Sequence, residues 1–125
     1  MHYESFYSNR ALVRTMISER ELGWFEGFLD GEGNFGIYHR SRGRAGFYVQ
    51  VRISNTDIAA IQRAQRILGG TVLLKQKSQV RNRALYVLNV PYESLHEWLP
   101  KMQLTVKEKH RLLVLEALSH PSVSR

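Results

Sequence analysis

The stretch that decides the fold is SERELGWFEGFLDGEG, residues 18–33. Ser18 and Glu21 form a capping box, in which a serine hydroxyl and a glutamate carboxylate each accept a backbone N–H at the start of a helix. The residues that follow predict a helix that runs to about Asp30. This helix ends on two carboxylates, Asp30 and Glu32, in a chain that is otherwise strongly basic.

Three glycines, Gly23, Gly27 and Gly31, repeat at a spacing of four and leave one face of this helix without side chains. Each glycine inside a helix costs roughly 1 kcal/mol relative to alanine. We expect the bare face to allow close approach of another backbone, as in helix pairs with small residues at every fourth position. Gly31 and Gly33 could instead be helix C-caps, but this does not explain the other two glycines.

Size and composition indicate one folded domain. The chain has 125 residues, of which 43% are hydrophobic and 10% aromatic, and this suits a single modest core. It contains no cysteine, which excludes disulfides and thiolate metal sites, and its five histidines show no ligand-like spacing. No apolar run approaches the ~20 residues of a membrane span, and no hydrophobic signal core is present. We therefore expect no membrane partner and a location in the cytoplasm or an organelle interior.

The net charge of +7 is distributed unevenly. From Gly33 to Tyr92 there is one acid, Asp57, against ten Arg and Lys residues, whereas the segment from Glu19 to Glu32 holds five of the eleven acids. Such segregation is typical of a nucleic-acid face with a separate acidic spot. Solubility or an acidic protein partner is the alternative. We favour nucleic acid because the basic residues alternate along predicted strands.

Alternating patterns predict two β-hairpins. The first spans 34–42 and 47–55, with apolar residues on one face, namely Phe35, Ile37, Phe47, Val49, Val51 and Ile53. Its other face is polar and cationic. The second hairpin spans 71–78 and 83–90, and Lys75 and Lys77 point to one side, where we expect Arg83 to join them.

Three further helices are predicted over 56–68, 92–99 and 105–118. The first of them has an apolar stripe, made of Ile58, Ile61, Ala64, Ile67 and Leu68. The second is expected to bury Leu95, Trp98 and Leu99. The predicted fold class is therefore α+β, with one antiparallel sheet that has helices on one face and solvent on the other.

We divide the chain into an N-terminal arm or short helix at 1–17, a single domain at 18–120 and a C-terminal tail at 121–125. Asp30 and Glu32 lie at a helix C-terminus, which already carries partial negative charge. Acids at that place beside a polyanion favour a bound cation, and Mg²⁺ accepts carboxylates, a carbonyl and substrate phosphates. Solvated surface acids are the alternative interpretation.

Two other positions are candidates for chemistry. Lys107 precedes or opens the last helix, where a cation is unfavourable on dipole grounds. It could contact phosphates or offset charge that develops during phosphodiester cleavage, although ordinary surface charge explains it as well. Asn55 ends the second strand, and a turn or helix cap is its better explanation from spacing alone.

The segment FEGFLDGEG, residues 25–33, resembles the signature of the LAGLIDADG homing endonucleases. The agreement extends over nearly the whole chain, from Ser18 to about Leu118. That family has an αββαββα domain in which the signature helix comes first and a saddle-shaped, four-stranded antiparallel sheet lies in the DNA major groove. The predicted order of elements is the same.

The resemblance implies roles for individual residues. Glu32 occupies the position of the essential metal-binding acid, Gly31 matches a residue whose carbonyl can face the metal, and Asp30 matches the first acid of the motif, which is usually more structural. Lys107 resembles a basic residue that lines the active site. Asn55 falls where some members position a water molecule. The implied catalytic set is thus Glu32, Lys107 and Asn55, with Mg²⁺ or Mn²⁺ held by Glu32, Gly31 and Asp30.

The single motif implies a homodimer that is joined through the signature helix, with an interface at Gly23, Trp24, Gly27, Phe28 and Gly31. A two-fold dimer would bring both copies of Glu32 to the symmetry axis and favour a long pseudo-palindromic site on double-stranded DNA. The polar side of the predicted sheet supplies the DNA-binding candidates. They are Asn34, Tyr38, Arg40, Arg42, Tyr48, Gln50, Arg52, Lys75, Lys77 and Arg83.

We therefore predict a metal-dependent, site-specific DNA endonuclease. A non-cleaving binder on the same fold, either a maturase that binds intron RNA or a transcription regulator, is the alternative. A structural RNA-binding protein explains the charge but not the glycine-notched acidic helix.

Overall fold

A computed structural model describes residues 18–41, 45–75 and 84–124. The N-terminal arm and three DNA-binding candidates, Arg42, Lys77 and Arg83, lie outside these residues. The elements follow in the order α2 (Glu19–Glu32), β1 (Gly33–His39), β2 (Phe47–Asn55), α3 (Ile58–Leu68), β3 (Val72–Lys75), β4 (Leu85–Asn89), α4 (Tyr92–Trp98), the 3-10 helix η1 (Leu99–Lys101), α5 (Glu108–Leu118) and β5 (Val123–Ser124).

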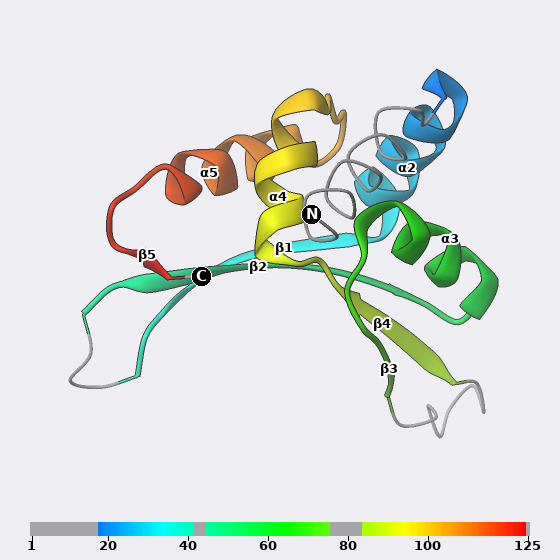
Figure 1. Ribbon diagram of the computed structural model, residues 1–125, viewed down its shortest axis with the longest axis horizontal. Coiled ribbons are helices and arrows are strands. Elements are labelled where there is room, and N and C mark those ends of the chain that lie inside the picture. The colour runs from blue at the N-terminus through cyan, green and yellow to red at the C-terminus, as the bar shows by residue number, and fades with distance from the viewer. Residues whose placement is uncertain (1–17, 42–44, 76–83, 125) are drawn as a thin grey trace, which may run out of the picture.

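The four main strands form an antiparallel sheet in the order β1-β2-β4-β3, and β5 adds a short parallel pairing to β2. The helices lie on one side of this curved sheet and leave the other side open (Figure 1). The predicted α+β class and the predicted order of helices and hairpins are confirmed. β5 and η1 were not predicted. No helix among the described residues is long and apolar enough to cross a membrane.

Local signals in the sequence account for the helix boundaries. The Ser18 hydroxyl accepts the N–H of Glu21 at 3.1 Å, as the capping box predicts, and Asp57 caps α3 through the N–H of Ala59 at 2.9 Å. The helix α2 runs two residues further than expected, to Glu32. Gly33 then turns the chain into β1, and a Cβ there would lie 2.5 Å from the Leu29 carbonyl oxygen, so no larger residue fits.

The core lies between the sheet and the helical layer. Phe25 and Leu29 of α2, Val51 and Ile53 of β2 and Leu88 of β4 are all buried within it. The prediction that Leu95, Trp98 and Leu99 are buried is confirmed.

Two residues of the predicted apolar faces are exposed. Ile37 is 44% exposed because β1 is an edge strand with a neighbour on one side only. Ile58 is 40% exposed because it is the first residue of α3.

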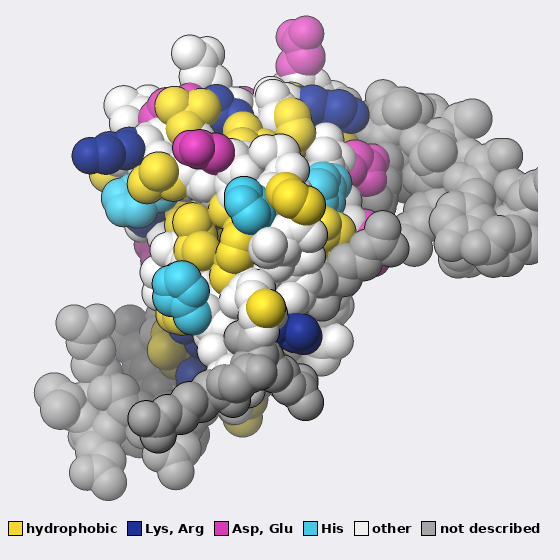
Figure 2. Space-filling model, turned by 90° about the vertical axis from the view of Figure 1, so that its left-hand side faces the viewer, with side chains coloured by type: hydrophobic (Ala, Val, Ile, Leu, Met, Phe, Trp, Pro, Cys, Tyr) yellow, Lys and Arg dark blue, Asp and Glu magenta, His cyan; other side chains and the backbone are white. Residues whose placement is uncertain are grey.

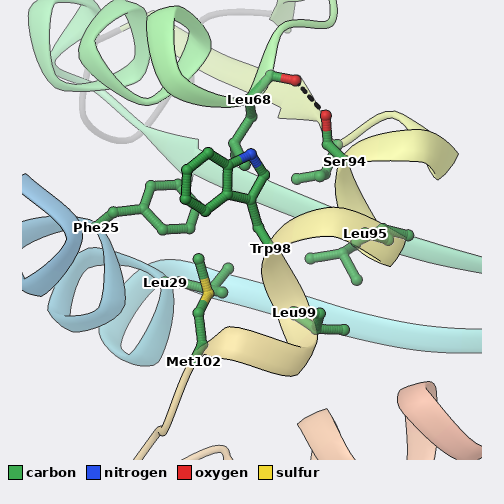
Figure 3. Close-up of a pocket in the computed structure, with 10 residues that line it drawn as sticks. Phe25, Leu29, Leu68, Ser94, Leu95, Trp98, Leu99 and Met102 are labelled. Carbon is green, nitrogen blue, oxygen red and sulfur yellow. Dashed lines mark hydrogen bonds between the residues drawn. The ribbon is translucent and has the colours of Figure 1, made fainter. Parts of the chain in front are cut away.

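Helices α2 and α4 and the end of α3 meet at a tight apolar junction (Figure 3). Phe25, Leu29, Trp98 and Met102 face one another there, and the Ser94 hydroxyl donates to the Leu68 carbonyl. The void at this junction measures about 10 Å³, which is room for about one water molecule. This space is too small for a substrate.

Candidate functional site

The open side of the sheet collects the predicted polar and cationic residues. Residues that face each other across antiparallel strands point to the same side, and the register pairs Asn34 with Arg52 and Tyr38 with Tyr48. Lys75 is paired with Leu85 of β4. Leu85 points to the same side of the sheet as Asn89, and Asn89 is paired with Arg52 of β2. The pairing and the alternation along each strand therefore place seven of the DNA-binding candidates on one face, namely Asn34, Tyr38, Arg40, Tyr48, Gln50, Arg52 and Lys75.

This open face has two unlike halves. On β1 and β2 it carries Arg40, Arg52 and the stacked rings of Tyr38 and Tyr48, whose centroids are 5.4 Å apart. On β3 and β4 the same face also carries apolar residues, which are Leu73, Leu85 and Val87. Within the described strands the open face contains no aspartate or glutamate. Among the described strand and turn residues, Arg40, Arg52 and Lys75 give this face its positive charge.

The sequence did not single out Asn89, which lies opposite Arg52. Asn89 helps to line a hollow of about 320 Å³ along the β2 edge, together with Arg40, Tyr48 and Gln50. Its Oδ1 atom is buried and has no hydrogen-bond partner within the part of the chain that the structure describes. Only the alternation of side chains along β4 places Asn89 on the open face, and the pairing of β4 with β2 sets which residues of β4 face that side.

A different surface is found at the end of the molecule that lies at the left in Figure 1. Figure 2 shows it face on, with hydrophobic and histidine side chains interspersed and with Lys and Arg scattered rather than gathered. Two leucines of α5, Leu112 and Leu113, are 52% and 48% exposed. The features expected of a polyanion site therefore lie on the open side of the sheet and not on α5.

At the C-terminal end of α2, the Asp30 carboxylate is engaged by the backbone. Its Oδ2 atom accepts the N–H groups of Thr105 at 3.0 Å and Val106 at 3.1 Å, and its Oδ1 atom accepts that of Lys107 at 2.8 Å. The N–H of Lys107, followed by the other two, holds the pKa of the Asp30 carboxyl below its ordinary value. Because these residues bend toward Asp30, α5 begins at Glu108 and not at the predicted residue 105.

Lys107 is the N-cap residue of α5, as its predicted place at the helix start implies. Its Nζ atom donates to the Gly31 carbonyl at 3.1 Å, which brings two predicted site residues together. The adjacent Glu108 does not neutralise it. Glu108 instead pairs with the buried Arg111 at 2.6 and 2.7 Å, and this guanidinium lowers the pKa of Glu108 to about 2.

Glu32 is the last residue of α2, and its side chain is exposed. Its carboxylate and the second lone pair of the Gly31 carbonyl are hard oxygen donors, which suit a divalent cation such as Mg²⁺. The described residues contain no group of three His, Cys, Asp or Glu side chains that could hold a metal ion. The donor set therefore fits a metal that takes its remaining ligands from water, substrate phosphates or a second subunit.

Asn55 has a structural task in this fold. Its Oδ1 atom accepts the N–H of Asp57 at 2.8 Å, which forms the turn that leads into α3. Asn55 lies two residues after Ile53 in β2, so both side chains point to the helix-covered side of the sheet. The turn interpretation of Asn55 agrees with this geometry, and its catalytic role stays a prediction.

The five predicted interface residues divide into two groups. Gly23, Gly27 and Gly31 are exposed, and a Cβ added at any of them would meet no atom within 4 Å. Trp24 and Phe28 are half-buried and stack with centroids 5.0 Å apart. Arg63 of α3 covers the Trp24 ring at 4.0 Å and forms a bidentate ion pair with Glu21.

Solved structures with a similar fold include three homing endonucleases. The chain aligns with the archaeal intron-encoded homing endonuclease I-Vdi141I complexed with DNA (TM-score 0.59, 20% identity, 78% of this chain and 66% of that one). It also aligns with the homing endonuclease I-CvuI in complex with its target in the presence of calcium (0.57, 23%, 77% and 64%). A third is the LAGLIDADG homing endonuclease I-LtrWI bound to target DNA (0.53, 19%, 80% and 37%).

No protein-family model and no curated protein matches the chain. The chain spans at most 66% of the length of each of the three aligned structures. At sequence identities of 19 to 23%, the similarity is one of fold. The resemblance of residues 25–33 to the family signature agrees with this result. The protein thus has the fold of the LAGLIDADG homing endonucleases.

Proposed function

We propose that this protein is a site-specific DNA endonuclease that hydrolyses phosphodiester bonds on both strands as a homodimer. The observation that supports this most is the end of α2, where the Gly31 carbonyl accepts the Lys107 ammonium group and the next residue, Glu32, has an exposed side chain. An anionic donor beside a placed ammonium group suits the cleavage of a phosphate ester. The three aligned proteins were each solved with DNA.

The open face of the sheet is the proposed DNA surface. Arg40, Arg52 and Lys75 provide positive charge for phosphates, and arginine can also read guanine in the major groove. Gln50 suits adenine, and the Tyr38 and Tyr48 rings provide flat contact area between the cations. Arg42, Lys77 and Arg83, outside the described residues, extend the same proposal.

In the proposed reaction, water attacks phosphorus and loses a proton to solvent, and the P–O bond to the leaving oxygen breaks as that oxygen gains a proton from solvent. Glu32 and the Gly31 carbonyl would hold Mg²⁺ or Mn²⁺, which when bound lowers the pKa of water and neutralises charge on the phosphate. The Lys107 ammonium offsets negative charge that develops on the phosphate oxygens. Asn55 keeps its amide nitrogen as a donor, and we propose that it orients water.

The proposed dimer pairs the glycine face of α2 with its copy. That face is exposed along Gly23, Gly27 and Gly31, with open space where side chains would be. An isologous contact there repeats each residue across a two-fold axis, so both Glu32 carboxylates approach the axis. The matching substrate is a pseudo-palindromic duplex, cleaved once on each strand.

The test incubates the protein with a randomised double-stranded DNA library and Mg²⁺, and sequencing identifies any double-strand cleavage product. Glu32→Gln should then lower the cleavage rate on the selected site by about 10²-fold or more, the scale of a lost transition-state contact, while DNA affinity persists. Glu19→Gln is the matched control, because it removes an exposed acid from the other end of α2. Unchanged cleavage by Glu32→Gln refutes the mechanism, and tight binding without cleavage by the wild type indicates a non-cleaving binder.

A further inference from the structure

The two acids that end α2 have different partners, and this difference separates their roles. We propose that Asp30, assisted by Glu26, is a positioning residue that holds Lys107 in the site, and that Asp30 is not a metal ligand. The catalytic meaning of this inference rests on the proposed function. Its structural part concerns only the contacts between α2 and the segment that leads into α5.

Four backbone N–H groups of one short segment donate to α2. The Glu26 Oε2 atom accepts that of Gln103 at 2.8 Å, and Asp30 accepts those of Thr105, Val106 and Lys107. Glu26 and Asp30 are four residues apart, so they lie one above the other on the same face of α2. We call these four bonds the carboxylate clamp. It joins parts of the chain that are 75 to 77 residues apart in sequence.

Lys107 is a poor residue for its place, and this explains why the clamp is needed. A lysine side chain has no acceptor atom, so it cannot cap a helix, and its charge is unfavourable at a helix N-terminus. In a capping box, an acid three residues into the helix accepts the N–H of the N-cap residue. Here His110 occupies that position, and Asp30 of another helix accepts the Lys107 N–H instead.

The same contacts argue against Asp30 as a metal ligand. A carboxylate offers about four lone-pair positions, and three N–H groups already use Asp30. One lone-pair position remains, on Oδ1, and a metal ion there would share that oxygen with the Lys107 N–H. Glu32, by contrast, is exposed, and the structure shows none of its carboxylate oxygens bonded to a described residue. Metal binding therefore falls to Glu32, while Asp30 fixes the ammonium group against the Gly31 carbonyl.

The first experiment needs no DNA. Amide hydrogen exchange by NMR should show that Asp30→Ala speeds exchange at Thr105, Val106 and Lys107 by about tenfold or more, equivalent to about 1.4 kcal/mol of lost protection, while α3 amides keep their rates. The dissociation constant for Mn²⁺ alone, measured by paramagnetic broadening, should stay within about threefold of the wild type, whereas Glu32→Gln weakens it by about tenfold or more. Faster exchange with unchanged Mn²⁺ affinity is the expected result.

The second experiment measures cleavage. Asp30→Ala should lower kcat by about tenfold or more with little change in KM, at an unchanged Mg²⁺ midpoint. Asp30→Asn retains one acceptor oxygen and should recover part of kcat. If Asp30→Ala fails to fold, Glu26→Ala removes one clamp bond and should speed exchange at Gln103. The proposal is overturned if Asp30→Asn weakens Mn²⁺ as Glu32→Gln does, or if the exchange rates do not change. If the wild type cleaves no DNA, the proposed function fails, and exchange and Mn²⁺ affinity still decide on the clamp.

Discussion

The two long faces of α2 differ in what covers them. One face inserts Phe25 and Leu29 into the core, where each side chain is 1% exposed. The other face presents Gly23, Gly27 and Gly31 with no atom within 4 Å of an added Cβ. The first face is thus completed by the rest of the same chain. Within one chain the second face brings only the free-energy cost of glycine in a helix, and this supports the proposal that a second copy of the protein covers it.

The largest effect is expected from a substitution on the buried face of α2. Leu29→Ala removes a buried side chain that lines the apolar junction with Val51 of β2 and with Leu95 and Trp98 of α4. It should lower the free energy of unfolding by about 2–5 kcal/mol, because the cavity adds to the lost transfer energy. Urea denaturation followed by circular dichroism measures this. A loss below about 1 kcal/mol would mean that α2 is not anchored through this face.

A smaller effect is expected from a substitution on the face of α2 that carries the three glycines. Gly27→Leu should weaken dimerisation by about tenfold or more, or about 1.4 kcal/mol, because a large side chain would separate the paired backbones. Sedimentation equilibrium measures the association constant. The fold of each chain should survive, since open space surrounds this position.

Gly27→Ala is the control for that variant. It adds one methyl group and improves helix propensity by up to about 1 kcal/mol, so the helix gains while the contact stays close. A Gly27→Leu protein that remains as dimeric as Gly27→Ala would place the interface elsewhere.

The smallest effect lies at the N-terminal end of the buried face of α2, where Glu21, four residues before Phe25, pairs with Arg63. This hydrogen-bonded guanidinium lowers the pKa of Glu21 from its ordinary value of 4.5. A lowered pKa in the folded state stabilises the fold above the unfolded value, and this contribution is lost as the pH falls through the folded value. Glu21→Gln should therefore flatten the decline in stability below about pH 4.5. Urea titrations across that range measure it, with Glu19→Gln as the control, and an unchanged acid limb would contradict the pairing.

Much of the fold follows from short-range patterns. The capping box at Ser18, the cap at Asp57 and the alternation along β2 each depend on residues within a few positions, so their prediction succeeded. Exposure of Ile37 was not predictable in this way, because alternation describes which way a side chain points and not whether anything covers it. β5 was missed because two residues carry no periodic pattern.

The candidate site shows the same division. The motif and its resemblance led to Glu32, Gly31 and Lys107, and the structure shows the last two in contact. The position of Asn89 on the open face was missed, since the phase of β4 is set by its pairing with β2 and not by its own composition.

By itself, the sequence determined the helices, the two hairpins, the basic character of the strands and the glycine repeat, because periodicity and capping act between neighbouring residues. Only the tertiary structure decided which acid at the end of α2 is engaged and which is exposed. Asp30 and Glu32 look alike in the motif, but the N–H groups that distinguish them come from residues 105–107. Contacts between residues so far apart in sequence form only in the packed fold. In that fold the Asp30 carboxylate accepts backbone N–H groups, whereas the Glu32 side chain is exposed to solvent.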